Sequence, residues 1–184
     1  MAKQYYILIL ALLLTSCARS PTQSRISRIA LSDIKAIPPG EAIVLGRVNF
    51  IREGEPVDWD SSAKGWTFQV HILPDTHPLP IPYALTGDGS FYWHLRPGGY
   101  TITEFRWYKL SLGTSEARGR RIFADFIVPE TTSLVYIGTL IIRFEEGCYA
   151  MRIEDEYDRA LEEVTSLEIS GEVIKHLMQL GKGR

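Results

Sequence analysis

The hydrophobic pattern changes twice along the chain. Residues 7–14 are all apolar, apolar and polar positions alternate from residue 42 onward, and apolar residues recur three or four positions apart after residue 155. Alternation that is rich in β-branched and aromatic residues, with turn residues between the segments, predicts successive strands. We expect these strands at residues 42–52, 66–73, 91–96, 100–110, 121–128, 133–144 and 149–154.

The C-terminal segment predicts two amphipathic helices. The apolar positions of the first are Ala160, Leu161, Val164 and Leu167. The second is expected over residues 171–180, where the apolar positions are Val173, Ile174, Leu177 and Met178 and Gly181 is a plausible stop. The sequence therefore predicts a mainly β fold, a single antiparallel β-sandwich of about seven strands, with two C-terminal α-helices packed on it.

The N-terminal apolar run ends in the motif Leu14-Thr15-Ser16-Cys17. Lys3 precedes the run, which is too short for a helix that spans a bilayer, and small residues lie directly before the cysteine, where a signal peptidase must fit the backbone. The motif resembles the lipobox of bacterial lipoproteins, which implies that residues 1–16 are a signal peptide and that Cys17 is lipidated. An ordinary secretory signal with a cysteine near its cleavage site is the alternative, and both interpretations predict export.

The sequence predicts one domain on a tether. Residues 17–41 hold the lipidated cysteine and a polar, proline-containing spacer, and residues 42–184 form the sandwich with its helices. The membrane is the first expected partner, through the lipid anchor at Cys17. Ala18 follows the cysteine where an aspartate would, by resemblance to enterobacterial lipoproteins, mark retention in the inner membrane. This resemblance favours the outer membrane of a bacterial cell envelope.

A second resemblance covers about residues 42–110. Its motifs are Gly46-Arg47-Val48, a turn at 54–57 (Gly-Glu-Pro-Val) and a hairpin at 88–100 that begins Asp-Gly-Ser-Phe. They resemble the carboxypeptidase-regulatory-like and transthyretin-like domains, which implies a transthyretin- or immunoglobulin-like sandwich. Within the hairpin, Phe91, Trp93 and Leu95 alternate onto one face, which we expect to be buried. Such domains are usually noncatalytic or adhesive modules, so the resemblance favours binding over chemistry.

Composition and spacing narrow the candidate chemistry. The formal net charge of −2 gives no basic footprint for nucleic acid. The histidines lie on separate expected elements, and no P-loop, dinucleotide fingerprint or serine nucleophile motif occurs, so neither a metal nor a cofactor is predicted. Cys148, the one thiol left once Cys17 is acylated, is expected to be a buried small hydrophobe.

Exposed aromatic and basic side chains are the remaining candidates for contacts. We expect Trp59, Tyr92 and Tyr108 to lie near turns or on the outer face, where rings stack on sugars or anchor a protein partner. Arg118, Arg120 and Arg121 are expected in a basic loop that could meet the phosphates of lipid headgroups. The leading hypothesis is a membrane-anchored, noncatalytic envelope lipoprotein that binds an envelope protein or has a structural role. A glycan-binding module and an unrecognised hydrolase are the alternatives.

Overall fold

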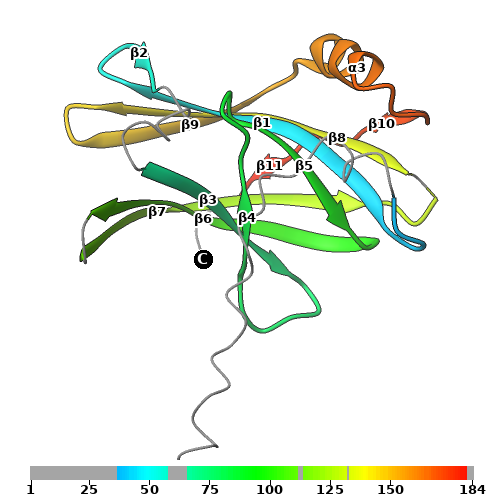
Figure 1. Cartoon of the computed structure of the whole chain (residues 1–184), viewed down its shortest axis with the longest axis horizontal. Helices are drawn as coiled ribbons and strands as arrows, with labels where there is room; N and C mark the ends of the chain where they lie inside the picture. Colours follow the sequence, from blue (N-terminus) through cyan, green and yellow to red (C-terminus); the bar gives the residue numbers. More distant parts are fainter. Residues whose placement is uncertain (1–36, 58–65, 112–113, 132, 182–184) are drawn as a thin grey trace, which may run out of the picture.

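The computed structural model describes residues 37–57, 66–111, 114–131 and 133–181, and these form two β-sheets packed face to face with one helix on the outside (Figure 1). Sheet A contains β1 (Ala42–Arg52), β2 (Glu55–Pro56), β5 (Ser90–Leu95), β8 (Leu134–Glu145), β9 (Cys148–Glu154) and β10 (Val173–Lys175). Sheet B contains β3 (Trp66–Pro74), β4 (Ile81–Ala84), β6 (Gly98–Ser111), β7 (Thr114–Val128) and β11 (Gln179–Leu180). The helix is α3 (Tyr157–Ser166). The predicted mainly β class is confirmed.

Sheet A is a mixed sheet, whereas the sequence predicted antiparallel pairing throughout. β8 pairs in parallel with β1 and with β10, while β5 and β2 pair antiparallel with β1 and β9 pairs antiparallel with β8. The first nine residues of β8 are all buried, and β1 begins with four buried residues. Parallel pairing suits such strands, because a strand that is covered on both faces needs a continuous apolar run.

Sheet B is antiparallel, in the order β11-β7-β6-β3-β4. Its longest element is the β6–β7 hairpin, in which the pairing runs from Gly98 with Val128 to Ser111 with Thr114. β7 therefore begins well before the expected strand start at residue 121. The expected basic loop at 118–121 is part of this strand, because its backbone continues the ladder with β6.

The main core lies between the two sheets and follows the alternation in the sequence. Phe91, Trp93 and Leu95 all point into it, as predicted, and the Phe91 and Trp93 rings stack with their centroids 3.7 Å apart. Other members of this core are Val44, Val48, Val70, Ile72, Ile102, Phe105, Ala124, Phe126, Val135 and Ile137.

A second core lies between the outer face of sheet A and α3. Ile43 and Leu45 of β1 and Tyr136 of β8 contact the helix side, where Ala160 and Val164 of α3 are buried. The predicted first helix is thus confirmed. Because this second core exists, sheet A is buried on both sides where α3 covers it.

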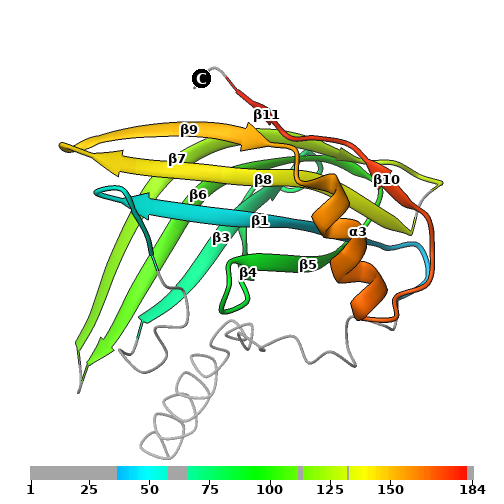
Figure 2. The same ribbon diagram turned by 90° about the horizontal axis from the view of Figure 1, so that it is seen from above.

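The predicted second helix is wrong. Residues 173–181 instead form an extended segment, here called the C-terminal strap, which contains β10 and β11 (Figure 2). Its backbone N–H groups at His176 and Met178 donate to the carbonyl oxygens of Tyr136 and Ile137, so β8 supplies the hydrogen bonds that a helix would have made internally. The strap joins sheet A to sheet B along one side of the sandwich.

Cys148 is exposed, not buried as the sequence suggested. It begins β9 directly after the turn at Gly147, where φ is +82°. The β8–β9 hairpin tip therefore carries the cysteine out of the core. No helix within the described ranges is long and apolar enough to cross a membrane.

Candidate functional site

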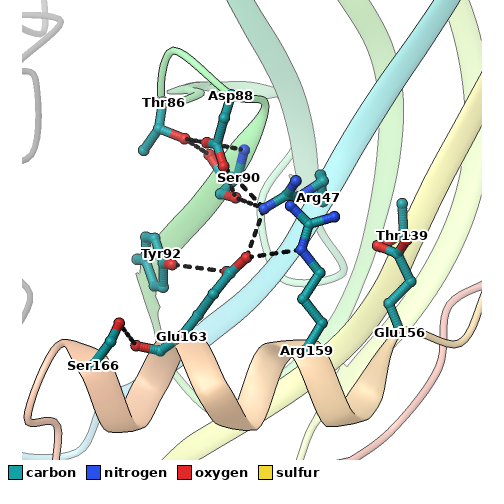
Figure 3. Close-up of polar contacts among 10 residues, drawn as sticks. All are labelled: Arg47, Thr86, Asp88, Ser90, Tyr92, Thr139, Glu156, Arg159, Glu163 and Ser166. Carbon is teal, nitrogen blue, oxygen red and sulfur yellow. Dashed lines mark hydrogen bonds and ion pairs between the residues drawn. The ribbon is translucent and has the colours of Figure 1, made fainter.

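Polar side chains gather in two places on the outside of the sandwich. The first, here called the helix latch, consists of Arg47, Asp88, Ser90, Tyr92 and Glu163 and lies between sheet A and α3 (Figure 3). The second is an open groove on the outer face of sheet B. The charges of the helix latch are paired with one another and leave almost no free space, whereas the groove is open and its carboxylates have no basic partner among the described residues.

Arg47 is the centre of the helix latch. It occupies an outward position of β1, and its side chain is only 9% exposed. Its Nη2 atom donates to Glu163 Oε1 at 2.6 Å, to Asp88 Oδ2 at 2.9 Å and to Ser90 Oγ at 2.9 Å. Two carboxylates and a hydroxyl thus offset the cost of burying the guanidinium group.

Glu163 links the helix to the strands below it. Besides the Arg47 bond, Glu163 accepts a hydrogen bond from the Tyr92 hydroxyl at 3.1 Å and one from Arg159 Nε at 3.3 Å (Figure 3). Burial and the nearby Glu163 charge raise the pKa of Tyr92 well above its ordinary value, so this hydroxyl stays protonated as a donor. The latch therefore holds α3 in place through a charged pair and a neutral donor.

The turn before β5 positions Asp88 for the latch. Asp88 Oδ1 accepts from Thr86 Oγ1 at 2.6 Å and from the Ser90 N–H at 3.1 Å, and Gly89 has a φ of +83°. Burial alone would raise the pKa of the Asp88 carboxyl, but the Thr86 and Ser90 hydrogen bonds and the Arg47 charge lower it below its usual value. Asp88 is thus held as an anion facing Arg47.

The latch has no room for a substrate. The space between Arg47, Tyr136, Thr139 and α3 has a volume of about 10 Å³, enough for about one water molecule. Thr139 donates at 2.6 Å to Glu156 Oε2, at the start of the helix. These contacts indicate a structural role.

The groove on sheet B is far larger, with a volume of about 770 Å³. Its lining positions Leu73, Thr101 and Asp125 alternate along their strands with core residues, so they face away from the sandwich interior. The C-terminal strap forms a further part of the wall. The apolar side chains include Leu73, Phe123 and Ile127, and the polar ones include Asp75, Thr101, Thr103, Asp125, His176 and Gln179.

Two carboxylates give the groove a negative charge. Asp125 Oδ1 accepts a hydrogen bond from Thr101 Oγ1 at 2.6 Å. The Asp75 N–H donates to Gly99 O at 3.0 Å, and the Asp75 carboxylate lies so close to Gly99 that a Cβ atom there would collide with it. No lysine or arginine occurs among the described residues that line the groove. His176 also lines it, and its buried Nδ1 atom has no hydrogen-bond partner within the described ranges.

The structure places the contact residues expected from the sequence in several different environments. Tyr92 is 7% exposed, contrary to the expected exposed ring, because α3 covers its outward position on β5. Arg120 is exposed, but its Nε donates to the Tyr149 hydroxyl and its guanidinium lies 4.9 Å from that ring centre, so it bridges β7 and β9. Arg121 is exposed on β7.

Four residues expected from the sequence to be contact or lipidation sites fall outside the described part of the chain, in whole or in their side chains. Trp59 and the lipidation residue Cys17 lie outside the described residues, as do the side chains of Tyr108 and Arg118. The groove itself was not predicted, because the outward positions of β7 that form it include the apolar Phe123 and Ile127 and so do not stand out as polar. Comparison of the chain with protein families, curated proteins and solved structures finds no match.

Proposed function

We propose that this chain is a noncatalytic lipoprotein of the bacterial cell envelope, anchored through Cys17, whose sandwich domain binds another envelope protein through the groove of sheet B. One observation carries the binding role. The groove of about 770 Å³ is open, whereas the outer face of sheet A is covered by α3. An open concave surface on a packed scaffold is where a domain of this kind offers contacts.

The chemistry of the groove suits a protein partner. Ile127 is 52% exposed in the wall, and Leu180 of the adjoining β11 is 39% exposed. Exposed apolar side chains beside carboxylates and hydroxyls resemble an interface, in which an apolar centre excludes water and polar groups set the orientation. A partner that covers Ile127 would bury apolar area that the isolated chain leaves in water.

The lipid anchor and the spacer expected from the sequence support the proposed location in the cell envelope. A diacylated and N-acylated Cys17 would hold the chain to a bilayer through several acyl chains, and the rest of the tether, up to residue 41, would separate the domain from the membrane surface. The Cys17→Ser variant should lose metabolic labelling by palmitate and remain uncleaved by the lipoprotein peptidase. Labelling that is unchanged in this variant would contradict the anchor.

A glycan is the second candidate ligand, and the groove gives it a specific argument. The Asp125 carboxylate, the Thr101 hydroxyl and the Phe123 ring line one surface, and sugar-binding sites combine such acceptors with an aromatic face. Of the three rings expected to stack on a glycan, Tyr92 is buried, whereas Trp59 and the side chain of Tyr108 lie outside the described residues. Calorimetric titration with soluble peptidoglycan fragments tests this candidate, because binding that is lost in Phe123→Ala would favour it over a protein partner.

The protein-binding role is tested with a matched pair of substitutions. Ile127→Lys changes the groove, and Leu161→Lys changes an exposed residue on α3, which is 36% exposed. After chemical crosslinking in cells that naturally express the chain, we expect a near-stoichiometric partner to co-purify with wild type and Leu161→Lys. The Ile127→Lys yield should fall at least about fivefold, since one anchor contact contributes on the order of 1–2 kcal/mol. Equal yields from the two variants would contradict the assignment of the groove.

A further inference from the structure

The charges of the sheet B groove point to the kind of segment that fills it. Asp75 and Asp125 are both exposed, and neither forms an ion pair within the part of the chain that the structure describes. Other acids of the described residues do have a basic neighbour, as in the pair between Glu104 and Arg106 at 2.6 Å. Among the described residues, the two carboxylates of the groove therefore have no basic partner.

We propose that the groove binds an extended, basic segment of the partner protein, with apolar residues interspersed among its lysines or arginines. This inference rests on the proposed function, because it names the chemistry of the partner at the same groove. The acids attract the basic side chains, and the apolar wall receives the residues between them. Electrostatic complementarity of this kind sets specificity and association rate more than total affinity.

The spacing of the acids supports an extended ligand. Asp75 follows β3 and Asp125 lies in β7, with β6 between these two strands. Both carboxylates reach over β6: that of Asp75 lies against Gly99, and that of Asp125 accepts a hydrogen bond from Thr101. Gly99 and Thr101 are alternate residues of this strand, about 7 Å apart on one face. Alternate residues of an extended peptide have the same spacing on one face, so two of its lysine or arginine side chains match the two carboxylates.

The apolar wall of the groove would contact the apolar residues of the proposed ligand. Leu73 lies on β3, whereas Phe123 and Ile127 lie on β7, so apolar surface is present beside both acids. Ile127 is paired with Gly99, whose lack of a side chain leaves room for the Asp75 carboxylate. A basic residue and an apolar residue of the ligand could therefore be received side by side.

The experiment uses two labelled peptides and the full-length lipidated chain in phosphatidylcholine nanodiscs. One octapeptide alternates lysine with valine, and the other alternates glutamate with valine. Fluorescence anisotropy measures binding of each peptide, and empty nanodiscs provide the blank. We expect the lysine peptide to bind at least about tenfold more tightly than the glutamate peptide at low salt, and the difference to shrink in 0.5 M NaCl, where the Debye length is only a few ångströms.

A matched pair of double variants locates the binding. Asp75→Asn with Asp125→Asn removes the groove charges, while Glu55→Gln with Glu145→Gln removes two exposed carboxylates at the hairpin ends of sheet A. Both double variants change the net charge equally. We expect the groove variant to weaken the lysine peptide about fivefold or more and the control to leave it nearly unchanged, since each exposed ion pair contributes up to about 1 kcal/mol. Unchanged melting temperatures will show that both variants are folded.

Two results would overturn the inference. The first concerns the peptides: both bind with equal affinity, or neither binds. The second concerns the variants: binding of the lysine peptide is unaffected by the groove variant, or it is weakened equally by the groove variant and the control. Either result leaves the protein-binding role standing if Ile127→Lys still removes the co-purified partner. Conversely, a lysine peptide that binds as expected without any co-purified partner would contradict the proposed function and not the charge preference of the groove.

Discussion

The outer faces of the two sheets carry similar polar residues with different consequences. On sheet A, α3 covers Arg47, and the guanidinium is paired with Glu163, Asp88 and Ser90. On sheet B no helix within the described residues covers Asp75 and Asp125, which face an open groove. The comparison teaches that a charged residue at an outward strand position stabilises the fold when another element covers it, and is available to a partner when none does.

The largest effect should come from the apolar part of the covered face. Leu45 is 1% exposed between β1 and α3, so Leu45→Ala should lower the free energy of unfolding by about 3 kcal/mol, through lost burial and a cavity. Ile127→Ala on the open face should change it by less than about 0.5 kcal/mol. Urea unfolding followed by tryptophan fluorescence measures both. A similar loss from both variants would mean that the two faces do not differ as described.

The second-largest loss of stability should come from breaking the helix latch. Glu163→Ala should cost about 2 kcal/mol of unfolding free energy, because the Tyr92 hydroxyl loses its acceptor and Arg47 loses one of its two carboxylates. Glu162→Ala, at the exposed neighbouring position of α3, is the matched control and should change stability by less than about 0.5 kcal/mol. If both substitutions cost the same, the latch does not hold the helix.

A smaller effect is expected from pH. The folded-state pKa of Asp88 is lowered, so its contribution is present above the unfolded pKa of about 4 and is lost as the pH falls through the lower folded value. Stability should therefore exceed that of Asp88→Asn by a constant amount near neutral pH, and the excess should shrink below about pH 4. Unfolding curves for both chains between pH 2.5 and 7 measure this excess. An excess that grows with acidity would have the wrong sign.

Much of the fold could be predicted because local pattern and tertiary environment agree there. Phe91 and Trp93 alternate toward the core, and Ala160 and Val164 recur at helical spacing toward sheet A. The strap could not be predicted in this way. The apolar positions between Val173 and Met178 are too few to distinguish helical from extended backbone, and the edge of β8 decides between them by accepting N–H groups of the strap.

The groove was also hard to predict, because tertiary pairing and not local sequence pattern brings its residues together. Its wall combines outward positions of β3, β6 and β7 with the strap, so the β-sheet register and the strap together determine which side chains share a surface. Thr101 and Asp125 are 24 residues apart in sequence but are register partners. Tyr92, one of the aromatic residues expected to be exposed, gave no signal for the groove, because α3 covers it on the other sheet.

The most direct test places a benzophenone amino acid at Ile127 and, in a separate chain, at Leu161. Both positions are exposed, one in the groove and one on the helix that covers sheet A. Irradiation of cells that naturally express the chain should give one reproducible crosslinked protein from position 127 and none from position 161. The account would be contradicted by crosslinks from position 161 alone, or by the same product from both positions, because the open face would then not be the surface that binds.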